Sequence, residues 1–237
     1  MAFATVDYDK HDAIGVVTLN RPEAINAFNV QMRDDLHEVL TAVRDDPEVR
    51  GVLLRGAGER GFCAGADLTE FGTAPSQAIA RKVRWERDVW GLMLSMLKPM
   101  VAAVHGHCIG SGVEIALCCD LRVAADDAVF SMPETQLGLI PAAGGTQTLP
   151  RIVGRGKALE MLLGGARLGA GEALRAGLVS RVTARERLEA VAFALLNAIL
   201  AAPDDALAAV KRAVHEGADM PRDAALALER RLAARLR

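Results

Sequence analysis

Two glutamates, Glu114 and Glu134, are the side chains of this sequence best suited to acid–base chemistry. They stand twenty positions apart, and a helix followed by a returning strand would let the two carboxyl groups face each other across a cleft. Paired carboxylates can move protons at adjacent carbons of a substrate. Taken singly, Glu114 would also suit the first turn of a helix, and Glu134 would also suit a surface position after a proline.

Two glycine-rich segments can supply a place for negative charge beside these carboxylates. One covers residues 61–68 (GFCAGADL), and the other covers residues 106–114 (GHCIGSGVE) and leads into a helix that is expected to begin near Ser111. Small residues let a ligand approach the main chain, and a helix N-terminus presents unpaired N–H groups. We therefore expect one N–H from each segment at an oxyanion, with a plain tight turn as the alternative for each.

The sequence predicts that strands and helices alternate around these segments. A stripe of apolar residues with helical spacing, at 36, 39, 40 and 43, predicts a helix for which Asn29 is the expected N-cap. A second, continuous helix is expected from Ser76 to Met96, ending before Pro99. Short apolar runs predict strands at residues 13–19, 52–54, 101–104, 121–124 and 129–131.

Beyond residue 180 the strand signal fades and three amphipathic helices are expected. We therefore predict an α/β core over residues 1–180, which carries the site, and a C-terminal helical region over residues 181–237. The apolar stripes of these helices must be buried, either on the core or against a neighbouring subunit.

Composition excludes several classes of protein. The 237 residues carry 28 basic and 30 acidic side chains, for a net charge of −2, so no broad positive face is available to nucleic acid. No stretch reaches the roughly 20 apolar residues needed to span a bilayer, and we expect a cytoplasmic protein without nucleic-acid or membrane partners. The four cysteines show no metal or redox spacing and are expected to be buried, reduced thiols.

Five motifs in one register resemble those of the enoyl-CoA hydratase/isomerase, or crotonase, superfamily, and the resemblance extends over nearly the whole chain. The motifs are FCAGADL at 62–68, KPMVAAVHG at 98–106, EIALCCD at 114–120, PE at 133–134 and GLIPAAGGTQ at 138–147. The resemblance implies a spiral of ββα units followed by helices that assemble homotrimers, often paired into homohexamers. It also implies an acyl-CoA thioester as substrate, with coenzyme A as part of that substrate and no metal or other cofactor.

The resemblance implies roles for particular residues by their place in these motifs. The N–H groups of Ala66 and Ser111 would form the oxyanion hole for the thioester carbonyl. Glu114 would take a proton from water that attacks C3, and Glu134 would deliver one to C2. The residues implied to line the coenzyme A channel, largely through their main chain, are Ala24, Ala64, Asp67 and Leu68.

Ser111 departs from the resemblance, because most relatives have glycine at this position. Helix capping is the expected role of its side chain. Hydration of an enoyl-CoA is the leading interpretation, because both glutamates are present. The alternatives are an enoyl-CoA isomerase or other crotonase-type chemistry, and an acyl-CoA binder without catalysis, for which Ser111 and a chain that ends sooner than its relatives would be the reasons.

Overall fold

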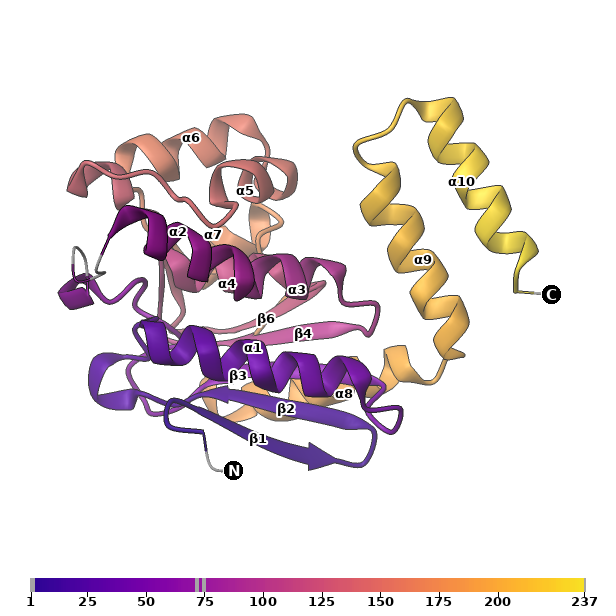
Figure 1. Cartoon of the computed structure of the whole chain (residues 1–237), viewed down its shortest axis with the longest axis horizontal. Coiled ribbons are helices and arrows are strands. Elements are labelled where there is room, and N and C mark those ends of the chain that lie inside the picture. Colours follow the sequence, from indigo (N-terminus) through magenta and orange to yellow (C-terminus); the bar gives the residue numbers. More distant parts are fainter. Residues whose placement is uncertain (1–2, 71–72, 74–75, 237) are drawn as a thin grey trace.

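A six-stranded sheet forms the centre of the chain in the computed structural model, which describes residues 3–70, 73 and 76–236 (Figure 1). Its order is β1-β2-β3-β4-β6-β9, with β1 antiparallel to β2 and all other neighbours parallel. The strands are β1 (Val6–His11), β2 (Ile14–Leu19), β3 (Gly51–Gly56), β4 (Met100–Val104), β6 (Leu121–Ala125) and β9 (Arg181–Thr183). The strands expected from the apolar runs are confirmed, with ends that differ by one or two residues.

A second, three-stranded sheet lies beside the first and has the order β5-β7-β8. Its strands are β5 (His107–Ile109), β7 (Val129–Ser131) and β8 (Leu168–Gly169). The chain passes from β4 to β5 at Gly106, whose φ is +50° and where a Cβ would lie 2.3 Å from the carbonyl oxygen of Arg60. From β4 onward the chain passes back and forth between the two sheets, because β4 and β5, β6 and β7, and β8 and β9 each divide between them. This arrangement agrees with the expected crotonase-like α/β spiral.

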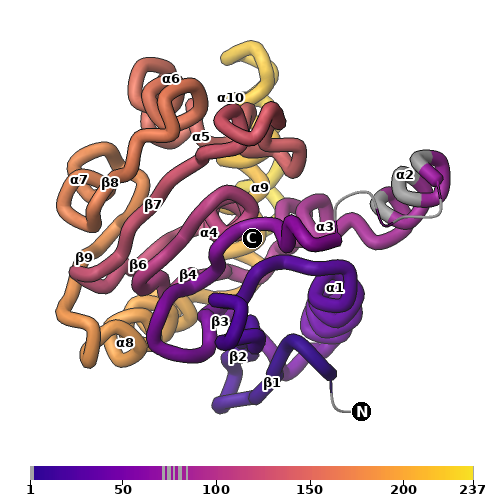
Figure 2. Tube along the Cα trace, turned by 90° about the vertical axis from the view of Figure 1, so that its left-hand side faces the viewer, coloured from indigo at the N-terminus to yellow at the C-terminus, as the bar shows by residue number. Residues whose placement is uncertain are grey.

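Helices cover both faces of the large sheet (Figure 2). Alternate residues of a strand point to opposite faces, so in β4 Ala102 and Val104 join one apolar cluster while Val101 and Ala103 join another. The first cluster is completed by α1 (Val30–Asp45), α3 (Val89–Ser95) and α4 (Ser111–Cys118), and the second by α8 (Leu188–Leu200). Burial on both faces is what parallel strands require.

The helix expected after Asn29 is confirmed as α1. The side-chain oxygen of Asn29 accepts a hydrogen bond of 2.9 Å from the backbone N–H of Met32, which satisfies one of the free donors of the first turn. The predicted apolar stripe is buried, as Leu36 and Val43 illustrate. Local sequence therefore determines both the start and the buried face of this helix.

The single helix expected over residues 76–96 is wrong, because the chain forms two helices there. α2 spans Gln77–Glu86, α3 spans Val89–Ser95, and Arg87 between them leaves the helical conformation. The carboxylate of Asp88 accepts a hydrogen bond of 3.0 Å from the N–H of Gly91 and so caps α3. A side-chain cap of this kind stabilises a helix start by about 1 kcal/mol, and it interrupts a stretch that is otherwise compatible with one helix.

The last two helices, α9 (Asp204–Gly217) and α10 (Arg222–Ala234), form a hairpin that stands away from the body (Figure 1). An ion pair of 2.8 Å between Lys211 and Asp120 ties α9 to the body. Because β9 and α8 pack within the layers of the large sheet, the chain leaves those layers only after α8. The division into domains at residue 180 stays a prediction.

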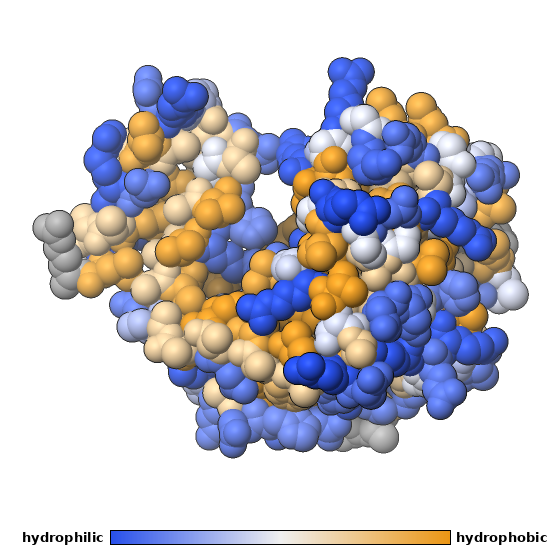
Figure 3. Space-filling model, turned by 180° about the vertical axis from the view of Figure 1, so that it is seen from behind, coloured by the Kyte–Doolittle hydropathy of each residue, from blue (hydrophilic) through white to orange (hydrophobic). Residues whose placement is uncertain are grey.

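The hairpin carries apolar side chains that nothing in the described chain covers. Val210 and Val214 on α9 are each 64% exposed, and Figure 3 shows apolar surface on the hairpin and around its base. No single helix of the described residues is long and apolar enough to cross a membrane. Only the bent pair Arg185–Leu200 and Asp204–Gly217, with 102° between its halves, has the combined length and composition.

The remaining helices close the side of the molecule around the small sheet. They are α5 (Gly145–Val153), α6 (Arg155–Gly164) and α7 (Ala170–Arg175). In the part of the chain that the structure describes, four short 3₁₀ segments join the larger elements, at Pro22–Ala24, Leu68–Glu70, Glu134–Leu137 and Arg185–Arg187. Two of these segments, Leu68–Glu70 and Glu134–Leu137, border the cavity in which the expected site residues meet.

Candidate active site

A cavity of about 500 Å³ lies between the start of α1, the stretch of chain after Cys63, the start of α4 and the loop before α5. Seven of the eight residues expected at the site line it. These are Ala64, Ala66, Asp67, Leu68, Ser111, Glu114 and Glu134. The eighth, Ala24, ends the segment Pro22–Ala24 outside the lining, next to Ile25, whose carbonyl accepts a hydrogen bond from the N–H of Ala64.

Two short stretches of chain run in parallel into this cavity and align the two expected oxyanion donors. Cys63 pairs with Cys108: the N–H of Cys63 donates to the carbonyl of His107 at 3.0 Å, and the N–H of Ile109 donates to the carbonyl of Cys63 at 2.9 Å. Ala66 and Ser111 each follow three residues after this pair. Their N–H groups therefore reach the same end of the paired stretches.

The N–H of Ala66 points away from its neighbouring chain. The N–H of Phe28 donates to the carbonyl of Gly65 at 2.7 Å, so that carbonyl points toward Phe28. In a trans peptide the N–H lies opposite the carbonyl, and the N–H of Ala66 must point the other way. No described residue accepts a hydrogen bond from it. Gly65 has a φ of +103°, which glycine adopts readily.

The N–H of Ser111 is free for the same kind of reason. The carbonyl of Gly110 accepts the first hydrogen bond of α4, from the N–H of Glu114 at 3.1 Å, so the N–H on the other side of that peptide points out of the helix start. Among the described residues none accepts from it. Two unpaired N–H groups at the cavity wall, one of them at a helix N-terminus, favour an oxygen that carries negative charge.

The capping role expected for the Ser111 side chain is wrong. Gly110 is the N-cap of α4, with φ +52° and ψ −119°, and no side chain caps this helix. Ser111 occupies the first helical position instead, where its hydroxyl makes no hydrogen bond with any residue that the structure describes.

Glu114 is fixed in the cavity wall by the loop before α5. Its side chain is buried, and its Oε1 accepts hydrogen bonds of 2.9 Å from the N–H groups of Ala143 and Gly145. A Cβ at position 145 would lie 3.0 Å from the same Oε1, so glycine lets the loop approach this closely. Two main-chain donors thus hold one oxygen and leave the other for a partner in the cavity.

Glu134 has a different environment. Burial raises the pKa of its carboxyl group above the usual value, and the charge of Glu114 raises it further. Its Oε2 is buried and finds no hydrogen-bond partner among the described residues. Two carboxyl groups in one site whose surroundings differ in this way can divide the work of base and acid.

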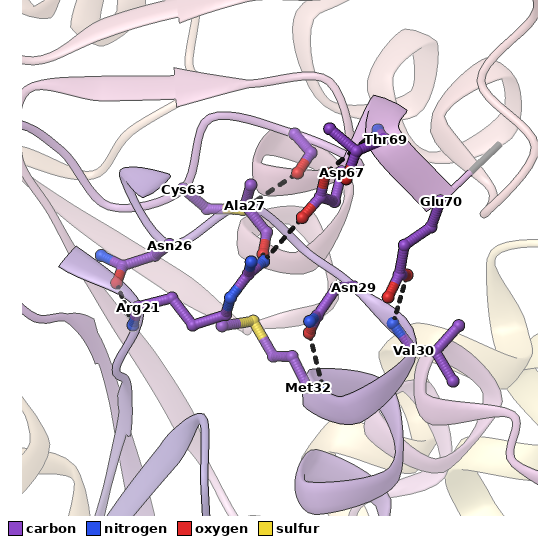
Figure 4. Close-up of polar contacts among 11 residues, drawn as sticks. Arg21, Asn26, Ala27, Asn29, Val30, Met32, Cys63, Asp67, Thr69 and Glu70 are labelled. Atoms are coloured by element: carbon purple, nitrogen blue, oxygen red, sulfur yellow. Dashed lines mark hydrogen bonds and ion pairs between the residues drawn. The ribbon is translucent and has the colours of Figure 1, made fainter. Parts of the chain in front are cut away.

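An arginine clamp holds the stretch that carries Ala66 (Figure 4). Arg21 donates from Nη1 to the carboxylate of Asp67 at 3.0 Å and to the carbonyl of Ala27 at 2.6 Å. The pKa of Asp67 is lowered, chiefly by the hydrogen bond from the Thr69 hydroxyl and also by the Arg21 charge. This clamp was not expected from sequence, because its partners stand 46 positions apart.

Two aromatic rings form part of the cavity wall. Phe28 and Trp90 line the cavity in an edge-to-face contact with ring centroids 4.9 Å apart. His105 lies outside the cavity with its Nε2 3.0 Å from the carbonyl oxygen of Gly58, and burial lowers its pKa.

No three His, Cys, Asp or Glu side chains of the described chain are grouped to hold a metal ion.

Comparisons with known proteins show what the whole chain is similar to. The family model described as enoyl-CoA hydratase/isomerase matches residues 9–236. A crotonyl-CoA hydratase of Syntrophomonas wolfei is 36% identical over 97% of this chain and 88% of its own. An (E)-benzylidenesuccinyl-CoA hydratase of Thauera aromatica is 38% identical over 92% and 84%. A crystal structure of an enoyl-CoA hydratase subunit from Geobacillus kaustophilus superimposes with a TM-score of 0.92, at 36% identity, over 99% of this chain and 90% of that one.

Proposed function

The chain belongs to the enoyl-CoA hydratase/isomerase family, and we propose that it is an enoyl-CoA hydratase, which adds water across the C2–C3 double bond of an enoyl-CoA thioester. The observation that carries this proposal is the pair of carboxyl groups in the cavity. Glu114 is held by two N–H groups, whereas Glu134 has an elevated pKa and an unpaired oxygen. Hydration needs a base at one carbon and an acid at the next.

The oxyanion hole consists, in this proposal, of the N–H groups of Ala66 and Ser111. Attack of water on C3 moves the electrons of the double bond onto the thioester oxygen and produces an enolate. Donors that are already fixed stabilise this charge without reorganisation, and removal of one donor typically costs about 10²–10³-fold in rate. The unpaired state of both N–H groups supports this assignment.

Glu114 is the base and Glu134 the acid. Glu114 takes a proton from water as its oxygen bonds to C3, and protonated Glu134 gives a proton to C2 as the enolate collapses to the thioester. One proton has then passed from water to Glu114 and one from Glu134 to the product, so exchange with solvent restores the starting state. The raised pKa of Glu134 supports its role as the donor. Water addition involves no electron transfer, and we expect no cofactor beyond the coenzyme A of the substrate.

Coenzyme A is held along the wall that leads to Ala66, in this proposal. Ala64, Asp67 and Leu68 line the cavity there, and Ala24 lies next to the chain that pairs with Ala64. The Asp67 carboxylate is engaged by Arg21 and Thr69, which supports contacts through the main chain of this stretch rather than through that carboxylate.

A second copy of this chain, in a homotrimer or a homohexamer, is the proposed partner of the α9–α10 hairpin. The exposed Val210 and Val214 support this proposal, because an amphipathic helix gains its stability by burying its apolar face. Light scattering should give a mass of three or six chains, and Val210→Asp with Val214→Asp should lower it. A single-chain mass for the wild type would contradict the proposal. The exposed Glu59→Lys serves as control.

The activity test uses crotonyl-CoA and follows the loss of the enoyl absorbance. Wild type should hydrate it, and Glu114→Gln and Glu134→Gln should each lose activity by about 10²–10⁴-fold, the usual contribution of a general acid or base. The exposed Glu59→Gln is the matched control and should behave as wild type. Unimpaired turnover in both glutamine variants of the cavity would contradict the mechanism. Proton exchange at C2 without incorporation of water would indicate an isomerase instead.

A further inference from the structure

The hydroxyl group of Ser111 plays no structural role among the described residues. It lies at the cavity wall on the first residue of α4, does not cap that helix, and makes no hydrogen bond with the described residues. The side chain is partly exposed to the cavity rather than sealed in the core. A serine at such a place is available to a ligand.

The position of this hydroxyl on the chain decides which ligand atom it can reach. Oγ and the backbone nitrogen of one serine are separated by three bonds, and two of the three staggered rotamers bring them within about 3 Å of each other. An oxygen that accepts a hydrogen bond from the N–H of Ser111 at about 2.9 Å is then also within reach of Oγ. The two donors of this residue can therefore share one acceptor.

We propose that the Ser111 hydroxyl donates a third hydrogen bond to the thioester oxygen, beside the N–H groups of Ala66 and Ser111. This inference rests on the proposed function, since it concerns the oxygen that becomes negative when water attacks C3. A hydrogen bond to a charged oxygen is stronger than one to a neutral oxygen, so this donor stabilises the enolate more than the bound substrate. Ser111 is in this way a catalytic residue through its side chain as well as its main chain.

Two other uses of the side chain predict different results. As a space-filling group it would restrict substituents at C2, and activity would depend on size and not on the hydroxyl. As a partner of Glu134 it would alter proton delivery, because the neighbouring Gly110 already lies against that carboxyl group, with a Cβ there 2.7 Å from Oε1. The variants must therefore separate hydroxyl, volume and acidity.

The experiment compares wild type with Ser111→Ala, Ser111→Gly and Ser111→Thr in the full chain. With crotonyl-CoA we expect kcat to fall about 10- to 100-fold in the alanine and glycine variants alike, the range for a hydrogen bond to a charged group. Ser111→Thr keeps the hydroxyl and should retain more of kcat than Ser111→Ala despite its extra methyl group. Ser180→Ala removes an exposed serine hydroxyl outside the cavity and should leave kcat unchanged.

A second measurement needs no turnover. The carbonyl stretch of bound butyryl-CoA, which has no double bond to hydrate, should lie at a lower frequency in wild type than in the alanine and glycine variants. This result supports the hydrogen bond even if wild type does not hydrate crotonyl-CoA, an outcome that would overturn only the proposed function. An unchanged stretch overturns the inference. So does a full kcat in Ser111→Ala, or a displaced pH profile without a carbonyl shift.

Discussion

Two substitutions of Glu114 should separate the structural role of its side chain from its proposed catalytic role. Its Oε1 is the acceptor for two main-chain N–H groups, from Ala143 and Gly145. In Glu114→Gln the amide oxygen can accept both hydrogen bonds, so the fold should keep its stability while the base is lost. In Glu114→Ala both donors lose their partner, the buried N–H of Gly145 and the part-buried N–H of Ala143. Each unsatisfied donor costs about 1–2 kcal/mol.

The stability loss expected for Glu114→Ala is therefore about 2–4 kcal/mol. For a chain of this length each kcal/mol shifts Tm by about 2–4 °C, so Tm should fall by about 4–16 °C. Both variants should lose kcat by about 10²–10⁴-fold. Scanning calorimetry at one fixed protein concentration and crotonyl-CoA turnover measure the two effects, because the Tm of an oligomer depends on concentration.

Glu59→Gln and Glu59→Ala are matched controls on an exposed glutamate and should change neither quantity. Equal Tm losses in Glu114→Gln and Glu114→Ala would show that the amide does not replace the carboxylate as acceptor. More than a tenth of wild-type kcat in Glu114→Gln would refute its role as base.

Three further predictions concern the surroundings of this pair. Because burial raises the pKa of Glu134, this acid stays protonated to a higher pH than an ordinary glutamic acid. The kcat of the wild type should therefore fall as the pH rises through that raised pKa. The residual activity of Glu134→Gln should not show this fall. Gly110→Ala should reduce kcat strongly, because φ is +52° and the new Cβ would lie 2.7 Å from a Glu134 oxygen. The control is Gly156→Ala on α6, where the new Cβ meets open space; it should leave kcat unchanged and the stability of the fold unchanged or slightly higher. Arg21→Met should lower kcat/KM by about tenfold through loss of the clamp on the Ala66 stretch. Arg44→Met is the control, because that exposed arginine pairs with its neighbour Asp45.

The sequence was informative where structure depends on neighbouring residues. Asn29 and the apolar stripe after it predicted α1, and the glycine segments led to the two free N–H groups. The break between α2 and α3 was missed, because one cap at Asp88 competes with a pattern that otherwise continues. Capping by Ser111 was also wrong, since Gly110 with its positive φ begins that helix.

Contacts between distant segments could not be predicted. The donors that hold Glu114 stand 29 and 31 positions from it, and the arginine of the clamp stands 46 positions from Asp67. Nothing in the local pattern of either segment specifies such partners, because they meet only when the sheets have assembled. The motifs identified which residues gather at the cavity but not what orients them.

The hydrogen bonds from the loop before α5 to Glu114 have a stereochemical consequence. With Oε1 committed to Ala143 and Gly145, the carboxylate can receive water only at its second oxygen, from one direction. If the N–H groups of Ala66 and Ser111 hold the thioester oxygen, as proposed, the planar enoyl group cannot turn over. Water then reaches a single face of C3, and the 3-hydroxyacyl product should form as one enantiomer.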